Sequence, residues 1–185
     1  MAMKVFSSKL IKKSEAFKLN SSEHKLLIKK MRDLENRALD KSELKRSRFD
    51  ERAQLSPRDR LTALIDPGMP FLELFNMTGY LVEDTNPETS IPGSSIISGI
   101  GYINETKCFI WIDDSGIDAG ALTMKSIEKG LACLKMAKKH KLPLIHLVES
   151  AGVNLMAYTV ELWAYAGGLF SGLAELSALG IPTIT

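Results

Sequence analysis

Residues 142–155 have the sequence Leu-Pro-Leu-Ile-His-Leu-Val-Glu-Ser-Ala-Gly-Val-Asn-Leu. The continuous apolar run 144–148 predicts a strand that is buried on both faces of a sheet, and the small residues 150–152 predict a turn at its carboxyl end. If a helix begins at Val153, its first amides have no partner within the helix and lie at the positive end of its dipole. The backbone amides of Gly152 and Val153 are therefore candidates for holding an oxyanion, although a plain strand-turn-helix connection has the same pattern.

The composition suits a globular domain with a hydrophobic core. The chain has 185 residues, 45% of them hydrophobic, and a formal net charge of +2. Residues 1–60 hold 17 Lys and Arg against 9 Asp and Glu, whereas residues 61–185 hold 7 against 13. The basic charges are interleaved with acids and lack the aromatic pairs of a nucleic-acid surface. We therefore expect a solvated helical surface or a landing site for a small anionic molecule, and no nucleic-acid partner.

The sequence indicates a soluble protein of a reducing compartment. Cys108 and Cys133 lack the spacing of a disulfide or metal framework and are expected to be core thiols. Met1–Lys13 never builds the apolar core of a secretory signal. The longest weakly polar stretch, Leu162–Ala174, has 13 residues, too few to span a bilayer. We expect the cytoplasm, or the mitochondrial matrix in a eukaryote, and no membrane insertion.

Two helical segments are predicted before the first strand. The first covers residues 21–54, with Ser22 as its N-cap, and it carries one narrow apolar stripe made of Leu27, Met31, Leu34 and Ala38. A narrow stripe predicts a helix that lies on the surface of something else. The second helix has Ser56 as its N-cap and Pro57 at its first position, and the Asp-Pro-Gly run 66–68 ends it.

The remaining pattern predicts an α/β domain. Strand-like runs occur at residues 71–74, 95–100 and 108–112, and residues 96–103 and 107–112 are expected to form a hairpin. The two glycines of the Gly-Ile-Gly run 99–101 suggest a strand bend or the close approach of another backbone.

A βαβ unit follows the predicted hairpin. Residues 122–140 have one apolar face and are predicted to be a crossover helix between parallel strands. Pro143 and Pro182 each stand where a helix gives way to a strand. This repetition is typical of stacked strand-helix units.

Other combinations of polar residues do not form a recognisable site. Asp113, Asp114 and Asp118 lack the spacing of a calcium loop, and we expect solvated or capping carboxylates there and no metal. Ser150 lies four positions after His146, about 13 Å at the usual rise of a strand, which is too far for a direct nucleophile–base pair.

Seven motifs occur in a characteristic order. They are Arg-Asp-Arg-Leu at 58–61, Leu-Ile-Asp-Pro-Gly at 64–68, Pro-Gly at 92–93, Ile-Ser-Gly-Ile-Gly at 97–101, Asp-Ala-Gly at 118–120, Glu-Ser-Ala-Gly-Val-Asn-Leu at 149–155 and Gly-Ile-Pro at 180–182. In this order they resemble the amino-terminal part of the carboxyltransferase (β) subunit of biotin-dependent acyl-CoA carboxylases, of the propionyl-CoA and methylcrotonyl-CoA type. The similarity runs from about Leu26 to Thr185.

This resemblance implies a crotonase-like fold of repeated ββα units, incomplete, with an amino-terminal helical extension. Residues 1–55 are then a basic helical extension, and residues 56–185 are a carboxyltransferase domain truncated at its carboxyl end. Two departures concern the turn. Ala151 stands in place of a usual glycine, and Val153, where alanine is common, is expected to narrow the space beside the acyl group.

The resemblance also implies the chemistry. Carboxybiotin, carried by a partner biotin carboxylase or biotin carrier subunit, would give its carboxyl group to an acyl-CoA through an enolate, and the amides of Gly152 and Val153 would stabilise that enolate. The amides of Ala119, Gly120 and Ala121 would meet the thioester or the phosphopantetheine arm.

The basic side chains of Arg58 and Arg60 are the expected partners of the coenzyme A phosphates. The alternative is that they only form ion pairs with Glu51 or Asp59 on a helix surface.

Two rival functions remain open. The first is a biotin-dependent acyl-CoA decarboxylase subunit, and the second is an inactive remnant that binds acyl-CoA or a partner. In the family that the chain resembles, subunits combine into homo-oligomers. The nearly all-round apolar segment Leu155–Leu179 agrees with that, because it predicts an exposed apolar face and self-association.

Overall fold

The computed structural model describes residues 7–185, without the side chain of Ala157. The first six residues of the segment Met1–Lys13 lie outside this range. The chain divides into two units, residues 1–34 and residues 35–185.

The amino-terminal helix begins earlier and ends sooner than predicted. Helix α1 spans Glu15–Glu43 and helix α2 spans Arg46–Glu51. The prediction of Ser22 as an N-cap was wrong, since Ser22 lies inside α1 and donates to a carbonyl of the preceding turn at 2.7 Å. Ser14 is the first acceptor, because its hydroxyl receives the Phe17 amide at 3.2 Å.

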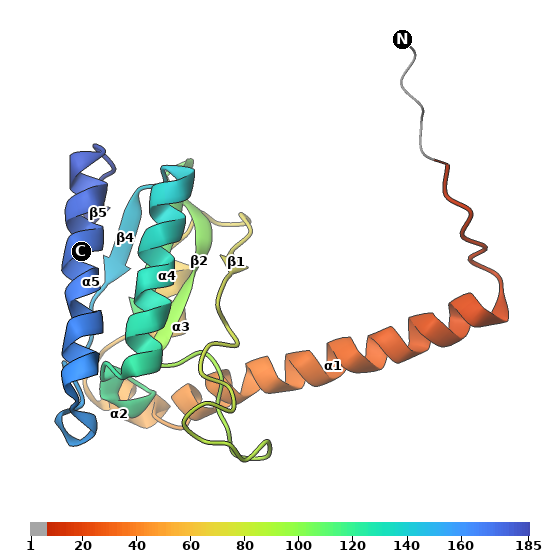
Figure 1. Cartoon of the computed structure of the whole chain (residues 1–185), viewed down its shortest axis with the longest axis horizontal. Helices are drawn as coiled ribbons and strands as arrows, with labels where there is room; N and C mark the ends of the chain where they lie inside the picture. The colour runs from red at the N-terminus through yellow and green to blue at the C-terminus, as the bar shows by residue number, and fades with distance from the viewer. Residues whose placement is uncertain (1–6) are drawn as a thin grey trace, which may run out of the picture. The chain divides into compact units, whose positions relative to one another are not determined.

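The second unit is built on a mixed five-stranded sheet in the order β1-β2-β3-β4-β5 (Figure 1). The strands are β1 (Leu72–Glu73), β2 (Ile96–Ile103), β3 (Thr106–Asp113), β4 (Leu144–Leu147) and β5 (Thr183–Ile184). β1, β2 and β3 pair antiparallel, whereas β3, β4 and β5 pair parallel. The predicted hairpin is confirmed, with Ile96 opposite Asp113 and Ile103 opposite Thr106.

Helices cover both faces of the sheet. They are α3 (Pro57–Leu64) on one face, and α4 (Met124–His140) and α5 (Val160–Ala178) on the other. The short 3₁₀ turns η1 (Asp118–Gly120) and η2 (Leu155–Ala157) lie before α4 and α5 in the sequence. On one face, Phe109 and Trp111 of β3 pack with Leu134 of α4 and Leu176 of α5. The other face packs its isoleucines against Leu61 of α3. Figure 1 shows α4 and α5 side by side over the sheet.

The start of α3 and both crossover connections agree with the sequence. The Ser56 hydroxyl accepts the Asp59 amide at 3.2 Å, and Pro57 is the first residue of α3. β3-α4-β4 and β4-α5-β5 are both crossovers between parallel strands, and β4 and β5 begin directly after Pro143 and Pro182. The close approach at the paired glycines is also confirmed, because a Cβ at Gly99 would lie 2.3 Å from the Leu72 carbonyl oxygen of β1.

The two cysteines are buried free thiols, as predicted. Burial raises the pKa of both, that of Cys133 to about 11. In residues 7–185, no helix combines the length and the apolar character that crossing a membrane requires.

Candidate functional site

Two turns that lie 30 residues apart in the sequence meet at the carboxyl end of β4. The Ala151 amide donates to the Ala119 carbonyl at 3.1 Å. The Ser150 hydroxyl donates to the Gly120 carbonyl at 2.7 Å. The fold therefore places the residues predicted to bind substrate against the turn predicted to hold the oxyanion.

The contact between the turns continues as a short parallel bridge between Leu122 and Val153. The Leu122 amide donates to Gly152 at 2.8 Å, and the Asn154 amide donates to Leu122 at 3.1 Å. In a parallel pairing of this kind, the N–H of the central residue points away from its partner. The Val153 amide accordingly makes no hydrogen bond within the described part of the chain.

Three of the other four predicted amides, those of Gly120, Ala121 and Gly152, are occupied. The Gly152 amide donates to the Ser150 hydroxyl at 3.0 Å. The Gly120 and Ala121 amides close the 3₁₀ turn by donating to Ile117 and Asp118 at 2.9 and 3.0 Å. Gly120, Ala121 and Gly152 therefore set the shape of the site, whereas the amides of Val153 and Ala119 have no hydrogen-bond acceptor among the described residues.

Glycine is needed in the two turns for different reasons. Gly120 has a φ of +70°, and a Cβ there would lie 2.3 Å from the Glu149 carbonyl oxygen. Gly152 has a φ of +84°, but a Cβ there would meet nothing within 4 Å. Backbone conformation alone requires glycine at position 152, whereas Gly120 also allows the two turns to touch.

The expectation of a helix that begins at Val153 was wrong. Val153 pairs with Leu122, and the Asn154 side chain accepts the Met156 amide at 3.1 Å, so that only the short turn η2 forms there. Helix α5 begins at Val160, where Thr159 accepts the Leu162 amide at 3.1 Å. The donor at Val153 therefore acts as a single oriented N–H group and not as a helix terminus.

The Val153 side chain faces the protein interior. It is half-buried and packs against Ile127, Leu162 and Ala166, between α4 and α5. The effect of this side chain on the space beside an acyl group stays a prediction.

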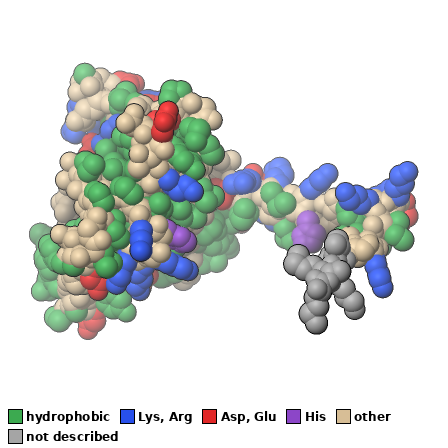
Figure 2. All heavy atoms as spheres, turned by 90° about the horizontal axis from the view of Figure 1, so that it is seen from above, with side chains coloured by type: hydrophobic (Ala, Val, Ile, Leu, Met, Phe, Trp, Pro, Cys, Tyr) green, Lys and Arg blue, Asp and Glu red, His purple; other side chains and the backbone are tan. Residues whose placement is uncertain are grey.

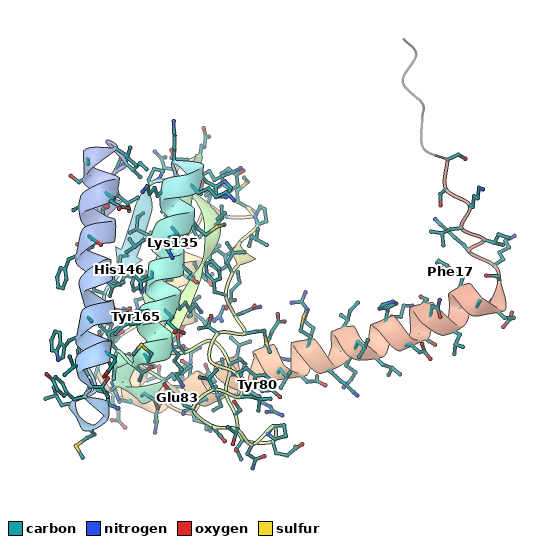
Figure 3. All side chains as sticks on the ribbon, in the orientation of Figure 1. Phe17, Tyr80, Glu83, Lys135, His146 and Tyr165 are labelled. Carbon is teal, nitrogen blue, oxygen red and sulfur yellow. The ribbon has the colours of Figure 1, made fainter. Side chains whose placement is uncertain are left out.

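Asp113 anchors the strand that leads into the turn. It is only 2% exposed, so that the expectation of a solvated carboxylate was wrong. Asp113 accepts the Trp111 indole N–H at 2.9 Å and the Glu149 amide at 3.1 Å. The His146 ring, labelled in Figure 3, stacks on Trp111 with ring centroids 4.3 Å apart, and its Nε2 lies 3.3 Å from Asp113. These hydrogen bonds offset the cost of burying the Asp113 carboxylate away from water.

Asp114 is also buried, and it ties the end of α1 to the site. It accepts the Ser42 hydroxyl at 2.7 Å and the Gly116 amide at 3.0 Å. Burial raises the pKa of Asp114. Asp118 lies 3.4 Å from the Lys41 ammonium. No group of three or more potential metal ligands occurs in the part of the chain that the structure describes.

Arg58 and Arg60 have carboxylate partners, though not the expected ones. Arg58 forms a bidentate pair with Glu73 at 2.6 and 2.9 Å, and Arg60 pairs with Glu149. Asp59 instead pairs with Arg46, and this hydrogen bond lowers the pKa of Asp59. A phosphate that meets Arg58 or Arg60 must compete with these carboxylates.

Sequence reasoning missed a cavity of about 370 Å³ beside the two turns. Its lining residues are Arg48, Arg52, Ser115, Ala119, Val148, Glu149, Ser150 and Ala151. The available signal was the four-residue spacing of Arg48 and Arg52, which places both on one face of a helix.

Comparisons with known proteins agree with this architecture. The family model for the carboxyl transferase domain matches residues 50–185. A Drosophila melanogaster protein named "Probable methylcrotonoyl-CoA carboxylase beta chain, mitochondrial" is 30% identical over 97% of this chain and 31% of its own length. A Mycobacterium tuberculosis protein named "Biotin-dependent 3-methylcrotonyl-coenzyme A carboxylase beta1 subunit" is 33% identical over 89% of this chain and 31% of its own length.

A solved structure is also similar. The β subunit of P. aeruginosa geranyl-CoA carboxylase superposes with a TM-score of 0.87 and 36% identity, over 96% of this chain and 33% of that one. The chain thus spans about a third of the length of these proteins. Because the family model covers most of its residues and the fold agrees, this chain belongs to the carboxyl transferase domain family, with its crotonase-like fold.

Proposed function

We propose that this chain supplies the enolate-stabilising part of a biotin-dependent acyl-CoA carboxyltransferase. Carboxybiotin, on a partner subunit, supplies the carboxyl group. The observation that carries the proposal is the unpaired Val153 amide beside the two interlocked turns. A thioester oxygen gains negative charge as the enolate forms, and one fixed N–H donor at such an oxygen lowers the barrier by about 2.7–4 kcal/mol.

The other site residues have defined parts in this proposal. Gly152 and Gly120 give the turns the positive φ angles that orient the Val153 amide. Ala119 lines the cavity and meets the phosphopantetheine arm, and Ala121 closes the turn that holds Ala119. No side-chain base is required, because this chain contributes electrostatic stabilisation.

The proposed activity requires partners. A biotin-carrying subunit must reach the turns, and we propose that copies of this chain assemble into a homo-oligomer in the cytoplasm or the mitochondrial matrix. One relative is named as mitochondrial and another comes from a bacterium, and both compartments are therefore proposed.

A purely binding function is the second candidate. It is favoured by the exposed apolar side chains of α5, such as Phe170 at 73% exposure. Under this alternative the chain would bind acyl-CoA or a partner without turnover.

The decisive experiment measures carboxylation of short and branched acyl-CoAs with the biotin-carrying partner present, in both directions. Gly152→Pro removes one N–H and forces φ from +84° to about −65°, and should abolish turnover. Val153→Ala keeps its backbone donor and should retain turnover within about tenfold. Turnover by a folded Gly152→Pro protein would refute the role of the turn. Acyl-CoA binding without turnover by the wild type would support the binding function, and turnover in the decarboxylation direction alone would support a decarboxylase.

A separate test addresses Arg58. If this side chain meets a phosphate, Glu73→Gln frees it from its carboxylate and should tighten acyl-CoA binding, whereas charge reversal of Arg58 and Arg60 together should weaken binding in a salt-sensitive way. Unchanged affinity in both variants would assign these arginines to structure.

A further inference from the structure

We propose that the cavity beside the two turns is a phosphate subsite, in which Arg48 and Arg52 hold the phosphate-bearing end of a coenzyme A thioester. This inference rests on the proposed acyl-CoA function. It also names residues that are distinct from Arg58 and Arg60.

The first argument is charge. Arg48 and Arg52 make no ion pair within the described residues, in contrast to Arg46, Arg58 and Arg60. The carboxylate in the cavity lining, Glu149, is already paired with Arg60. The cavity therefore has a positive excess that an anionic group would neutralise.

The second argument is hydrogen bonding. Arg48 Nε and Ser115 Oγ are buried, and neither has a hydrogen-bond partner in the part of the chain that the structure describes. Both residues line this same cavity. Buried polar atoms nearly always find partners, and a phosphate oxygen accepts hydrogen bonds from both guanidinium and hydroxyl groups.

The third argument is geometry. Phe49, which is fully buried, fixes α2 in the second unit. Arg48 lies within α2, and Arg52 is the residue that directly follows its last turn. The cavity volume of about 370 Å³ lies within the range of small-molecule sites. Ala119, Ser150 and Ala151 also line it, so that the subsite adjoins the turns of the proposed reaction centre.

The test uses calorimetric binding of inorganic diphosphate, coenzyme A and pantetheine to the 185-residue chain. Arg48→Gln and Arg52→Gln should each weaken diphosphate and coenzyme A binding about tenfold and leave pantetheine binding unchanged. Ser115→Ala should weaken the same two ligands by a smaller factor. Lys139→Gln, which removes one charge from α4, is the matched control and should change nothing. Arg52 is exposed, and its replacement tests the site even if Arg48→Gln unfolds.

The outcomes separate the subsite from the proposed function. Arginine-dependent diphosphate binding without any acyl-CoA carboxylation would keep the subsite and refute the function. Acyl-CoA binding that is equal in the wild type and the double variant would refute the subsite and keep the function. Acetate that competes for the cavity as well as diphosphate does would also overturn the phosphate subsite, because the cavity would then be a general carboxylate site.

Discussion

Helices α4 and α5 occupy equivalent places in the fold but have very different surroundings. Each connects two parallel strands, and they lie side by side on the same face of the sheet (Figure 1). α4 buries seven of its 17 residues, including Lys129. α5 has 19 residues, is more apolar, and buries three, Leu162, Ala166 and Leu176.

The two helices differ in how many of their apolar side chains are buried within this chain. The buried apolar side chains of α4 pack against the sheet and against α5. α5 and the segment before it instead expose a set of large apolar residues, namely Leu155, Met156, Tyr158, Val160, Trp163, Tyr165, Phe170, Leu173 and Leu179. Hydrophobic side chains are accordingly prominent on the surface of this unit in Figure 2. Because soluble monomers rarely expose large apolar patches, we expect this set of side chains, the interaction surface, to contact further protein.

The largest expected effect tests the buried side of the comparison. Leu134 of α4 is 3% exposed and packs in the main core, so Leu134→Ala should lower the free energy of unfolding by about 2–5 kcal/mol. Chemical denaturation would measure it. If Leu134→Ala lowered the free energy of unfolding by less than Phe170→Ala, a change at an exposed residue of α5, the proposed difference in burial between α4 and α5 would be wrong.

The next effect concerns the buried charge on α4. The Lys129 ammonium donates to the Gly93 and Ile96 carbonyls at 2.9 and 2.5 Å, and burial lowers the pKa of Lys129 to about 8. Glu73, Asp114, Arg58 and Cys133 are the charged or titratable groups around it.

Between pH 8 and 10.5 the unfolded chain binds more protons at Lys129 than the folded chain, so stability should rise with pH there, by about 3 kcal/mol at most. Cys133 acts in the opposite direction between pH 9 and 11, because its thiol holds its proton longer when folded. The stability of the wild type minus that of Lys129→Met, measured across this range, isolates the lysine. A flat difference would contradict the assignment.

A smaller effect tests the contact between the two helices. A Cβ at Gly172 would lie 2.7 Å from the Leu134 side chain, whereas a Cβ at Gly167 would meet nothing within 4 Å. Gly167→Ala should therefore stabilise the protein by about 0.5–1 kcal/mol through helix propensity. Gly172→Ala should lose about 1 kcal/mol through overpacking. Thermal melts of the pair give the answer, and equal shifts would mean that α4 and α5 are not in close contact.

The smallest effect on stability, within about 0.5 kcal/mol, is expected for Phe170→Ser on the exposed face of α5. Its effect on association should be large, because it removes apolar surface from the interaction face. Sedimentation velocity would show the wild type self-associating and the variant shifted toward monomer, with Lys139→Gln as an unchanged control. A wild-type chain that is a sharp monomer peak and binds no apolar dye would refute the interaction surface.

The local elements of this fold could be predicted because their signals are short-range. The Ser56 cap, the hairpin of β2 and β3, and the crossover helix α4 each follow from residues a few positions apart. The family, too, could be inferred from ordered motifs, because each motif occupies one turn or one strand end. The helix expected at Val153 failed for the converse reason: its alternative partner, Leu122, lies on a distant turn.

The sequence by itself determined an α/β fold, the position of a small-residue turn after a buried strand, and an apolar segment at residues 155–179. Only the tertiary structure decided that the Val153 amide is available, since its orientation depends on the pairing of Val153 with Leu122 on a distant turn. It also decided which arginines are free, because an ion pair such as Arg60 with Glu149 joins residues 89 positions apart. Hydrogen bonds and short-range ion pairs require two groups to lie within a few ångströms of each other. The separation of two residues along the sequence does not give their distance in space.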